Sequence, residues 1–536
     1  MVVEGRVFTA DPDAPWAEAL VARDGVITYV GTLEQARAVA ADAAEAIEAA
    51  GVVLPGFIDA HAHVLSHGHA LRRASLRPCT DLQQIHHEIS RWLAANSDAP
   101  RVLGVGWTFS AVPGSTPTRH HLDAVVADRP VYLDASDLHS VWVNTAALAE
   151  LGITDDTPDP IGGRIVRDAA GHATGLLLEN AGYHIAWPVM NRTTSADNDA
   201  ALQAAIAAYL AGGTTAAVDM ALDTPSLQAL LRADSAGRLP FTVVAHWLIN
   251  RTGELATELE QVTQAAELAA AHSSGRVRVA GIKLITDGTI DGCTAGMCQP
   301  FTNGEPGEMV WPRDALEPVV LAADEAGLQI AAHAIGDLAV RTVLDVFEVA
   351  AARRAARGDT RERRHRIEHL EYVDTADVAR LAPLGVTASM QPVHCDPAYL
   401  DNWEELLGPE RAQRGFAWPE YLAHGTTLAF GTDTPTADYR ALLNMYIAAT
   451  RRSPHVPSAR PLRPDWALPM EAAVVHGTRD AAWASFEERR RGMLRVGLTA
   501  DLCILDGDPF EAGPEALLDA AVTHTVVNGR VAYRAS

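Results

Sequence analysis

A pair of histidines follows an apolar segment in the first part of the chain. Residues 54–63 read LPGFIDAHAH, so a single alanine separates His61 from His63. Alternate side chains of a β-strand share a face, and a strand through this segment points both imidazoles the same way. Two imidazoles on one face at a strand end can bind one divalent metal ion. Asp59 falls on the same face, and we expect it to orient one of the histidines.

Four further residues of ligand type stand at the ends of later apolar segments. They are Lys283, His333, His369 and Asp433. Imidazole nitrogens and a carboxylate oxygen suit zinc, and also iron, nickel or manganese. A lone histidine at a strand end is more often a hydrogen-bonded core residue. Several such residues on one rim instead indicate a metal site, and we predict one here, with zinc as its metal.

Lys283 lies between Ile282 and Leu284, where a lysine cation is costly to bury. Burial lowers the pKa of a lysine and leaves a neutral, nucleophilic amine. Such an amine can take up carbon dioxide to give a carbamate, an anion that can bridge two metal ions. A Lys283 that pairs with Asp287 or Asp291 is the alternative, and composition does not decide between the two.

The elements that must position these residues alternate between apolar strands and alanine-rich amphipathic helices. Strands are predicted over residues 54–60, 214–220, 241–249, 277–286, 328–333, 364–369, 385–392 and 426–432. Helices are predicted between most of them, for example over 199–210, 254–271, 313–326 and 339–354. Eight such units indicate a closed (β/α)₈ barrel, whose active site lies at the C-terminal ends of the strands. An open doubly wound sheet is the structural alternative.

Two regions lie outside this alternation. β-rich segments at both ends predict one small β-sandwich from residues 1–53 and 486–536, with the barrel over 54–485; two unrelated β-rich caps are the alternative.

The connection over about 66–212 is far too long for an ordinary crossover, and it predicts an inserted subdomain over the barrel mouth. The candidate substrate contacts are Trp107 and His139 in this insertion, together with His394, and simple packing is the alternative for them.

Composition narrows the partners. The chain has 536 residues, 48% of them hydrophobic, and a net charge of -25, which argues against nucleic acid or an anionic membrane surface. No apolar run approaches the roughly 20 residues of a membrane span, and the first residues lack a signal-peptide pattern. Five scattered cysteines argue against a disulfide framework. We therefore expect a cytoplasmic protein with a small-molecule substrate, and a homodimer is left open.

Several motifs together resemble the amidohydrolase superfamily, and within it the N-substituted formamide deformylase-like branch, the "amidohydrolase 3" group. The motifs are residues 55–63, 139–148, 175–179, 283–288 and 366–371, with the strand-end His333 and the sequence Gly431-Thr432-Asp433. The resemblance covers nearly the whole chain and implies a barrel with a β-sandwich from both termini. It also implies that His61, His63, Lys283 and Asp433 hold one metal ion, and that carbamylated Lys283, His333 and His369 hold a second.

The function expected from these observations is hydrolysis of an amide-type carbon–nitrogen bond, such as an N-formyl or N-acyl bond. A hydroxide that bridges two metal ions would attack the carbonyl, and Asp433 would pass its proton to the leaving nitrogen. A cyclic-amide hydrolase or a deaminase of the same superfamily is the alternative, although Ala-Ile-Gly-Asp follows His333 where such deaminases use a glutamate. The alternative from another class is a non-catalytic regulatory protein that keeps the barrel.

Overall fold

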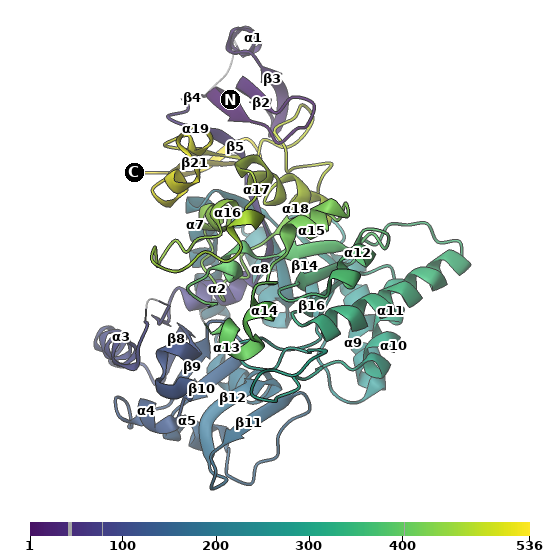
Figure 1. Cartoon of the computed structure of the whole chain (residues 1–536). Helices are drawn as coiled ribbons and strands as arrows, with labels where there is room; N and C mark the ends of the chain where they lie inside the picture. Colours follow the sequence, from purple (N-terminus) through teal and green to yellow (C-terminus); the bar gives the residue numbers. More distant parts are fainter. Residues whose placement is uncertain (41–44, 78, 401) are drawn as a thin grey trace.

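The computed structural model describes residues 1–40, 45–77, 79–400 and 402–536 of the chain. Figure 1 shows a β domain that contains both termini, a central barrel, and an insertion on the side of the barrel away from the β domain. In the described parts of the chain, no helix combines the length and the apolar character needed to cross a membrane.

Eight parallel strands form the barrel, and they follow one another around it in sequence order. The strands are β6 (Phe57–Ala62), β13 (Thr214–Leu222), β14 (Thr242–Leu248), β15 (Val277–Ile285), β16 (Gln329–Ala334), β17 (Arg366–His369), β18 (Thr387–Met390) and β19 (Leu428–Phe430). The segment after β19 closes on β6, since the N–H of Asp433 donates to the carbonyl of His61 (2.7 Å) and the N–H of His63 to the carbonyl of Thr434 (2.9 Å). The predicted barrel is therefore confirmed, and the open doubly wound sheet is not formed.

Helices pack around the barrel strands (Figure 1). They are α7 (Ser195–Ala211), α8 (Thr224–Ser235), α9 (Leu255–Ala271), α10 (Arg313–Glu325), α11 (Asp337–Ala356), α12 (Thr375–Leu381), α15 (Trp418–Ala423), α16 (Ala441–Thr450), α17 (Met470–His476) and α18 (Arg479–Ala484). Side chains fix several of their starts. At α7 the hydroxyl of Thr194 accepts from the N–H of Asp197, whose carboxylate accepts from the N–H of Thr194, a reciprocal cap that satisfies two free backbone donors.

A glycine allows the closure of the barrel next to the predicted metal ligands. A Cβ on Gly431 would lie 2.3 Å from the backbone nitrogen of His61 and 2.7 Å from its Cβ. Both atoms belong to a buried strand that cannot move aside, so a side chain at this position would push the end of β19 away from β6. Glycine at 431 therefore brings Asp433 close to the histidines of β6.

The β domain joins the two ends of the chain. Its strands are β1 (Val2–Phe8), β2 (Trp16–Arg23), β3 (Val26–Gly31), β4 (Ala46–Glu48), β5 (Val53–Pro55), β20 (Leu502–Leu505), β21 (Val522–Val527) and β22 (Arg530–Arg534). They belong to one hydrogen-bonded sheet, in which β5 pairs antiparallel with β20. Val7, Leu20, Val53, Ile504 and Val526 share one apolar core. A β domain from both termini is thus present, as predicted, and two unrelated caps are not.

The insertion has its own sheet and core. Its strands lie in the order β11, β12, β10, β9, β8, β7, with bounds β7 (Ala74–Ser75), β8 (Val102–Trp107), β9 (Val131–Ala135), β10 (Ser140–Val143), β11 (Gly163–Arg167) and β12 (Ala173–Glu179). Its helices include α3 (Leu82–Ala95), α4 (Arg119–Asp123) and α5 (Thr145–Leu151). Helix α7 falls in the range predicted for the insertion, but it packs on α2 (Val64–Ala70) and β13 of the barrel.

Candidate metal centre

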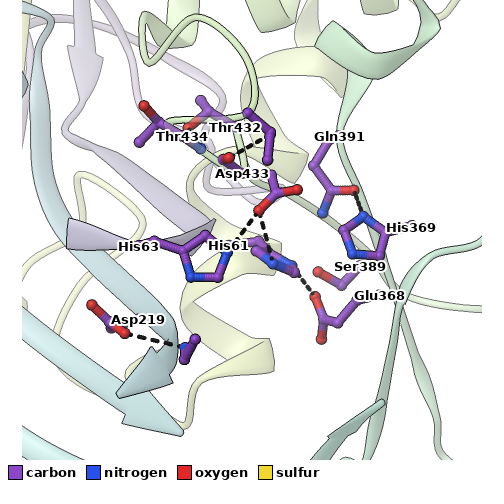
Figure 2. Close-up of polar contacts among 12 residues, drawn as sticks. His61, His63, Asp219, Glu368, His369, Ser389, Gln391, Thr432, Asp433 and Thr434 are labelled. Atoms are coloured by element: carbon purple, nitrogen blue, oxygen red, sulfur yellow. Dashed lines mark hydrogen bonds and ion pairs between the residues drawn. The ribbon is translucent and has the colours of Figure 1, made fainter. Parts of the chain in front are cut away.

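The residues predicted as metal ligands gather at the C-terminal ends of barrel strands. They are His61 in β6, His63 directly after it, Lys283 in β15, His333 in β16, His369 at the end of β17, and Asp433 in the loop after β19. All of them are buried except His63, which is partly buried. Figure 2 shows His61, His63 and Asp433 pointing toward one another, with His369 on the side of His61 away from His63.

His61, His63 and Asp433 form a first group of candidate ligands. The Oδ1 atom of Asp433 lies 3.2 Å from Nε2 of His61 and 3.0 Å from Nε2 of His63. The ligand atoms of the three residues all lie within 4.8 Å of one another. Nε2 of His61 is buried and has no hydrogen-bond partner, because its approach to Asp433 lacks hydrogen-bond geometry. A buried imidazole nitrogen without a partner beside two further donors fits a metal ligand.

A second group of candidate ligands shares Asp433. His369, His394 and Asp433 again offer ligand atoms within 4.8 Å of one another. The rings of His369 and His394 are parallel, with centroids 5.7 Å apart, and Nε2 of His394 lies 3.6 Å from Oδ2 of Asp433. His394 was predicted as a substrate contact, and the structure places it where a metal ligand could also stand.

His333 is adjacent to this second group but belongs to neither set of three. Its ring centroid lies 4.5 Å from that of His369. Its Nε2 atom lies 3.3 Å from the carbonyl oxygen of Gly288 and 3.4 Å from Oδ1 of Asp287. Nδ1 is therefore the nitrogen that remains for a metal ion.

A buried ion pair orients His61. Nδ1 of His61 lies 2.7 Å from Oε2 of Glu368, and Nε of Arg366 donates to Oε1 of Glu368 (2.6 Å). Arg366 also donates to the carbonyl of Ala60 (2.7 Å) and to the hydroxyl of Ser389 (2.6 Å). Burial opposes ionisation of Glu368, but Arg366 and His61 lower its pKa. A carboxylate that accepts from Nδ1 keeps the lone pair of Nε2 free for a metal ion.

Sequence reasoning did not assign a role to Arg366 or Glu368. The signal was present, because alternation in β17 places these two residues on one face and Ile367 on the other. It could not reveal the partner, since His61 is 307 positions away in the sequence.

The prediction that Asp59 orients a histidine ring is wrong. Its carboxylate accepts from the N–H (2.8 Å) and the hydroxyl (2.5 Å) of Thr432, and from the hydroxyl of Tyr209 (3.2 Å). Its bond to His61 goes to the backbone N–H, not to the ring. Asp59, in β6, therefore holds the loop that contains Asp433 against β6. This contact positions Asp433 relative to His61 and His63.

Lys283 is 2% exposed in the barrel interior. Burial lowers the pKa of its amine to about 8, although the carboxylates of Glu368 and Asp433 oppose that shift. The alternative pairing with Asp287 is not formed. Asp287 instead accepts hydrogen bonds from the backbone N–H groups of Gly296, Ile335 and Gly336, at 2.9 to 3.1 Å.

The backbone is strained at two of the candidate ligands. His369 and Asp433 have φ values of 77° and 55°, in the left-handed region that non-glycine residues rarely adopt. Each such residue costs on the order of 1 kcal/mol or more and persists only where its surroundings fix it. Here the N–H of Asp433 donates to the carbonyl of His61, and the N–H of Leu370 to the carbonyl of Ala334 (3.2 Å). Strain of this kind is typical of functional sites.

A cavity opens above these ligands, and all three predicted substrate contacts line it: Trp107, His139 and His394. Trp107 is buried, and its indole N–H donates to the carbonyl of Leu133 (2.9 Å). Nδ1 of His139 lies 2.6 Å from Oε2 of Glu179, and its ring centroid lies 4.8 Å from that of His333. Burial opposes protonation of His139, but Glu179 raises its pKa to about 9. The insertion thus reaches the candidate metal ligands through His139.

A barrel with histidines and an aspartate at its strand ends is typical of metal-dependent barrel proteins. Comparison with known proteins identifies the family. The family model for the amidohydrolase family matches residues 45–533, so the chain belongs to that family. It is 30% identical to YtcJ of Bacillus subtilis (99% of each chain) and 28% identical to the N-substituted formamide deformylase of Arthrobacter pascens (99% and 98%). An uncharacterized metal-dependent hydrolase from Pyrococcus horikoshii has a similar crystal structure, with TM-score 0.75, 25% identity, and coverage of 95% and 98%.

Proposed function

We propose that this protein is a metal-dependent hydrolase that cleaves an amide-type carbon–nitrogen bond in a small molecule. The observation that carries the proposal is the convergence of His61 and His63 on Asp433, which lines a cavity together with His333 and His369. The similarity to an N-substituted formamide deformylase supports the type of bond. Hydrolysis of an N-formyl or N-acyl group is the specific reaction we expect.

His61, His63 and Asp433 would hold one divalent ion, and His333 and His369 a second. The mixture of imidazole nitrogens and a carboxylate favours zinc. Lys283 would lie between them as a carbamate. Its neutral Nζ would bond to the carbon of carbon dioxide and release one proton to solvent, and the resulting anion would supply ligand oxygens to the site. The lowered pKa and the burial of Lys283 support this role.

Divalent ions held there would make water a nucleophile near neutral pH and would polarise a carbonyl oxygen. The chain's own residues supply the proton transfers and the orientation. Asp433 accepts a proton from the water that attacks the carbonyl carbon, and returns it to the leaving nitrogen as the carbon–nitrogen bond breaks. Glu368 and Arg366 keep Nε2 of His61 in place, and the carboxylate of Asp59 holds the loop that carries Asp433.

The test begins with the purified protein, which is stripped with a chelator and then reloaded with zinc. Hydrolysis of a panel of N-formyl and N-acetyl amines should disappear on chelation and return with the metal. The variant Asp433→Asn should lose activity, whereas Asp465→Asn, which removes an exposed carboxylate bonded to Arg463, should retain it.

Two outcomes would reject the proposal. Turnover that survives complete removal of the metal would exclude metal-dependent hydrolysis. If the zinc-loaded protein hydrolyses no member of the panel, the non-catalytic regulatory alternative is favoured instead.

A further inference from the structure

We infer that the cavity selects substrates with a neutral or cationic aromatic group and rejects those with an anionic group remote from the scissile bond. This inference rests on the proposed function and names the substrate class for the same site. It follows from three features of the cavity: the charges on its wall, the partners of its histidines, and its aromatic surfaces.

The wall of the cavity is acidic. Besides Asp433, the carboxylates of Asp137, Asp291 and Glu371 line it, and no lysine or arginine does so among the described residues. The oxygens of Asp137 accept from the backbone N–H of His139 and from the hydroxyl of Thr289, both at 2.9 Å. Both donors are neutral, so these hydrogen bonds leave the negative charge of Asp137 in place.

The histidines of the wall already have acidic partners. Nδ1 of His139 is bound to Glu179 (2.6 Å), and Nδ1 of His394 to Glu371 (3.2 Å). Any positive charge on these rings is therefore balanced within the protein. A substrate carboxylate would compete with an existing carboxylate for either ring, and it would lose its hydration without gaining an unpaired cation.

Two basic residues near the site, Lys283 and Arg77, add no cation to the wall. Lys283 lies in the barrel interior and does not line the cavity. Arg77 donates to the carbonyl oxygen of Thr436 (2.9 Å), and it too is outside the lining. Neither is placed to meet a substrate anion on the wall.

Aromatic side chains supply the apolar part of the wall. Trp107 packs against Phe109 with ring centroids 4.9 Å apart, and Trp403 stacks on Phe416 at 5.6 Å. Trp107, Phe109 and Trp403 all line the cavity. Phe109, which is only partly buried, offers an aryl group an aromatic surface, and a cation on that aryl group is also attracted by Asp137.

The test uses ligands that differ only in remote charge. Phenylacetohydroxamic acids with a para carboxylate, carboxamide or amidine share a metal-anchoring hydroxamate and have similar shapes, with charges of -1, 0 and +1 on the ring substituent. Their dissociation constants for the zinc-loaded protein can be measured by titration calorimetry at low salt. The carboxylate should bind roughly tenfold or more weakly than the carboxamide, and the amidine at least as tightly as the carboxamide.

A variant of Asp137 tests whether the wall causes the difference in affinity between the carboxylate and the carboxamide ligands. Asp137→Asn keeps an acceptor for the N–H of His139 but removes the charge, so the penalty on the carboxylate should shrink several-fold while the carboxamide changes little. The exposed Asp465→Asn serves as the control and should leave the order unchanged.

The outcomes separate this inference from the proposed function. A carboxylate that binds as tightly as the carboxamide overturns the inference, even if the protein hydrolyses amides. If none of the three ligands binds, a metal-anchored aromatic ligand has no place in the cavity, and the inference fails. Amide turnover, measured separately, decides the proposed function alone.

Discussion

The base of the cavity and its wall are built in different ways. Among the candidate ligands at the base, two imidazoles are fixed by partners that belong to the barrel: His61 by Glu368 and His369 by Gln391. On the wall, Trp107 and His139 are fixed by the carbonyl of Leu133 and by Glu179, which belong to the insertion. The insertion therefore supplies one part of the wall, and barrel segments supply the candidate ligands and the rest of the wall, including Glu371, His394 and Trp403. Changes at the base should affect metal binding and turnover, and changes on the wall should affect which ligand is bound.

The largest effect is expected from removing a ligand at the base. His61→Asn removes one of the three donors of the first group, so zinc content should fall and turnover should drop to background, by about 10⁴-fold or more. Elemental analysis and initial rates measure both quantities. His172→Asn, at an exposed histidine, is the matched control and should change neither. Full zinc content and full turnover in His61→Asn would mean that the base is not the metal site.

A smaller effect is expected from replacing a residue that hydrogen-bonds to a candidate metal ligand. Glu368→Gln weakens the bond that orients His61, and zinc affinity should fall about 10- to 100-fold. Competition with a chromophoric chelator gives this number without any assay of turnover. Gln391→Ala removes the neutral partner of His369 and should have the smaller effect of the two. The Glu368→Gln variant also deprives Arg366 of a buried charged partner. The thermal stability of this variant must therefore be recorded beside its zinc affinity.

On the wall, Phe109→Ala should alter binding and spare the chemistry. Phe109 lines the cavity and is only partly buried, so the insertion tolerates its loss. We expect KM for an aromatic amide to rise about tenfold, from lost apolar contact of roughly 1 to 2 kcal/mol, with kcat changed less than about threefold. Steady-state kinetics distinguish the two parameters. A fall in kcat with constant KM would show that base and wall are not separable.

The smallest effect concerns the pH dependence of stability. Glu179 raises the pKa of His139 to about 9, above the ordinary value near 6.5. A raised pKa in the folded state gives stability that is fully present below pH 6.5 and is lost as the pH rises through 9. At pH 6 the free energy of unfolding of the native protein should therefore exceed that of the His139→Gln variant by up to about 3 kcal/mol. This difference should shrink by pH 10. A difference that stays constant over this range would contradict the pairing.

The barrel could be predicted from the sequence because its signals are local. All eight predicted strands are present, and the helices predicted over 254–271 and 313–326 are observed as Leu255–Ala271 and Arg313–Glu325. Apolar segments of strand length and amphipathic segments of helix length need no knowledge of their neighbours. The strand-end histidines could be identified for the same reason, since the C-terminal ends of parallel barrel strands meet.

The partners of those histidines could not be predicted in this way. The bond between His61 and Glu368 depends on how β6 faces β17 across the barrel interior, and the bond between Asp59 and Thr432 depends on closure between β6 and β19. Neither relation has a periodic signature in the sequence. The same limit applies to α7, whose alanine-rich sequence does not tell whether it covers the insertion or the barrel.

The most direct measurement is anomalous diffraction at the zinc edge from crystals of the zinc-loaded protein grown with bicarbonate. The predicted result is two peaks at coordination distance, about 2.0 to 2.3 Å from their ligands, one on His61, His63 and Asp433 and one on His333 and His369. Density should extend beyond Nζ of Lys283 toward both. Peaks away from these side chains, or none at all, would contradict the central claim, and a plain amine at Lys283 would contradict the carbamate.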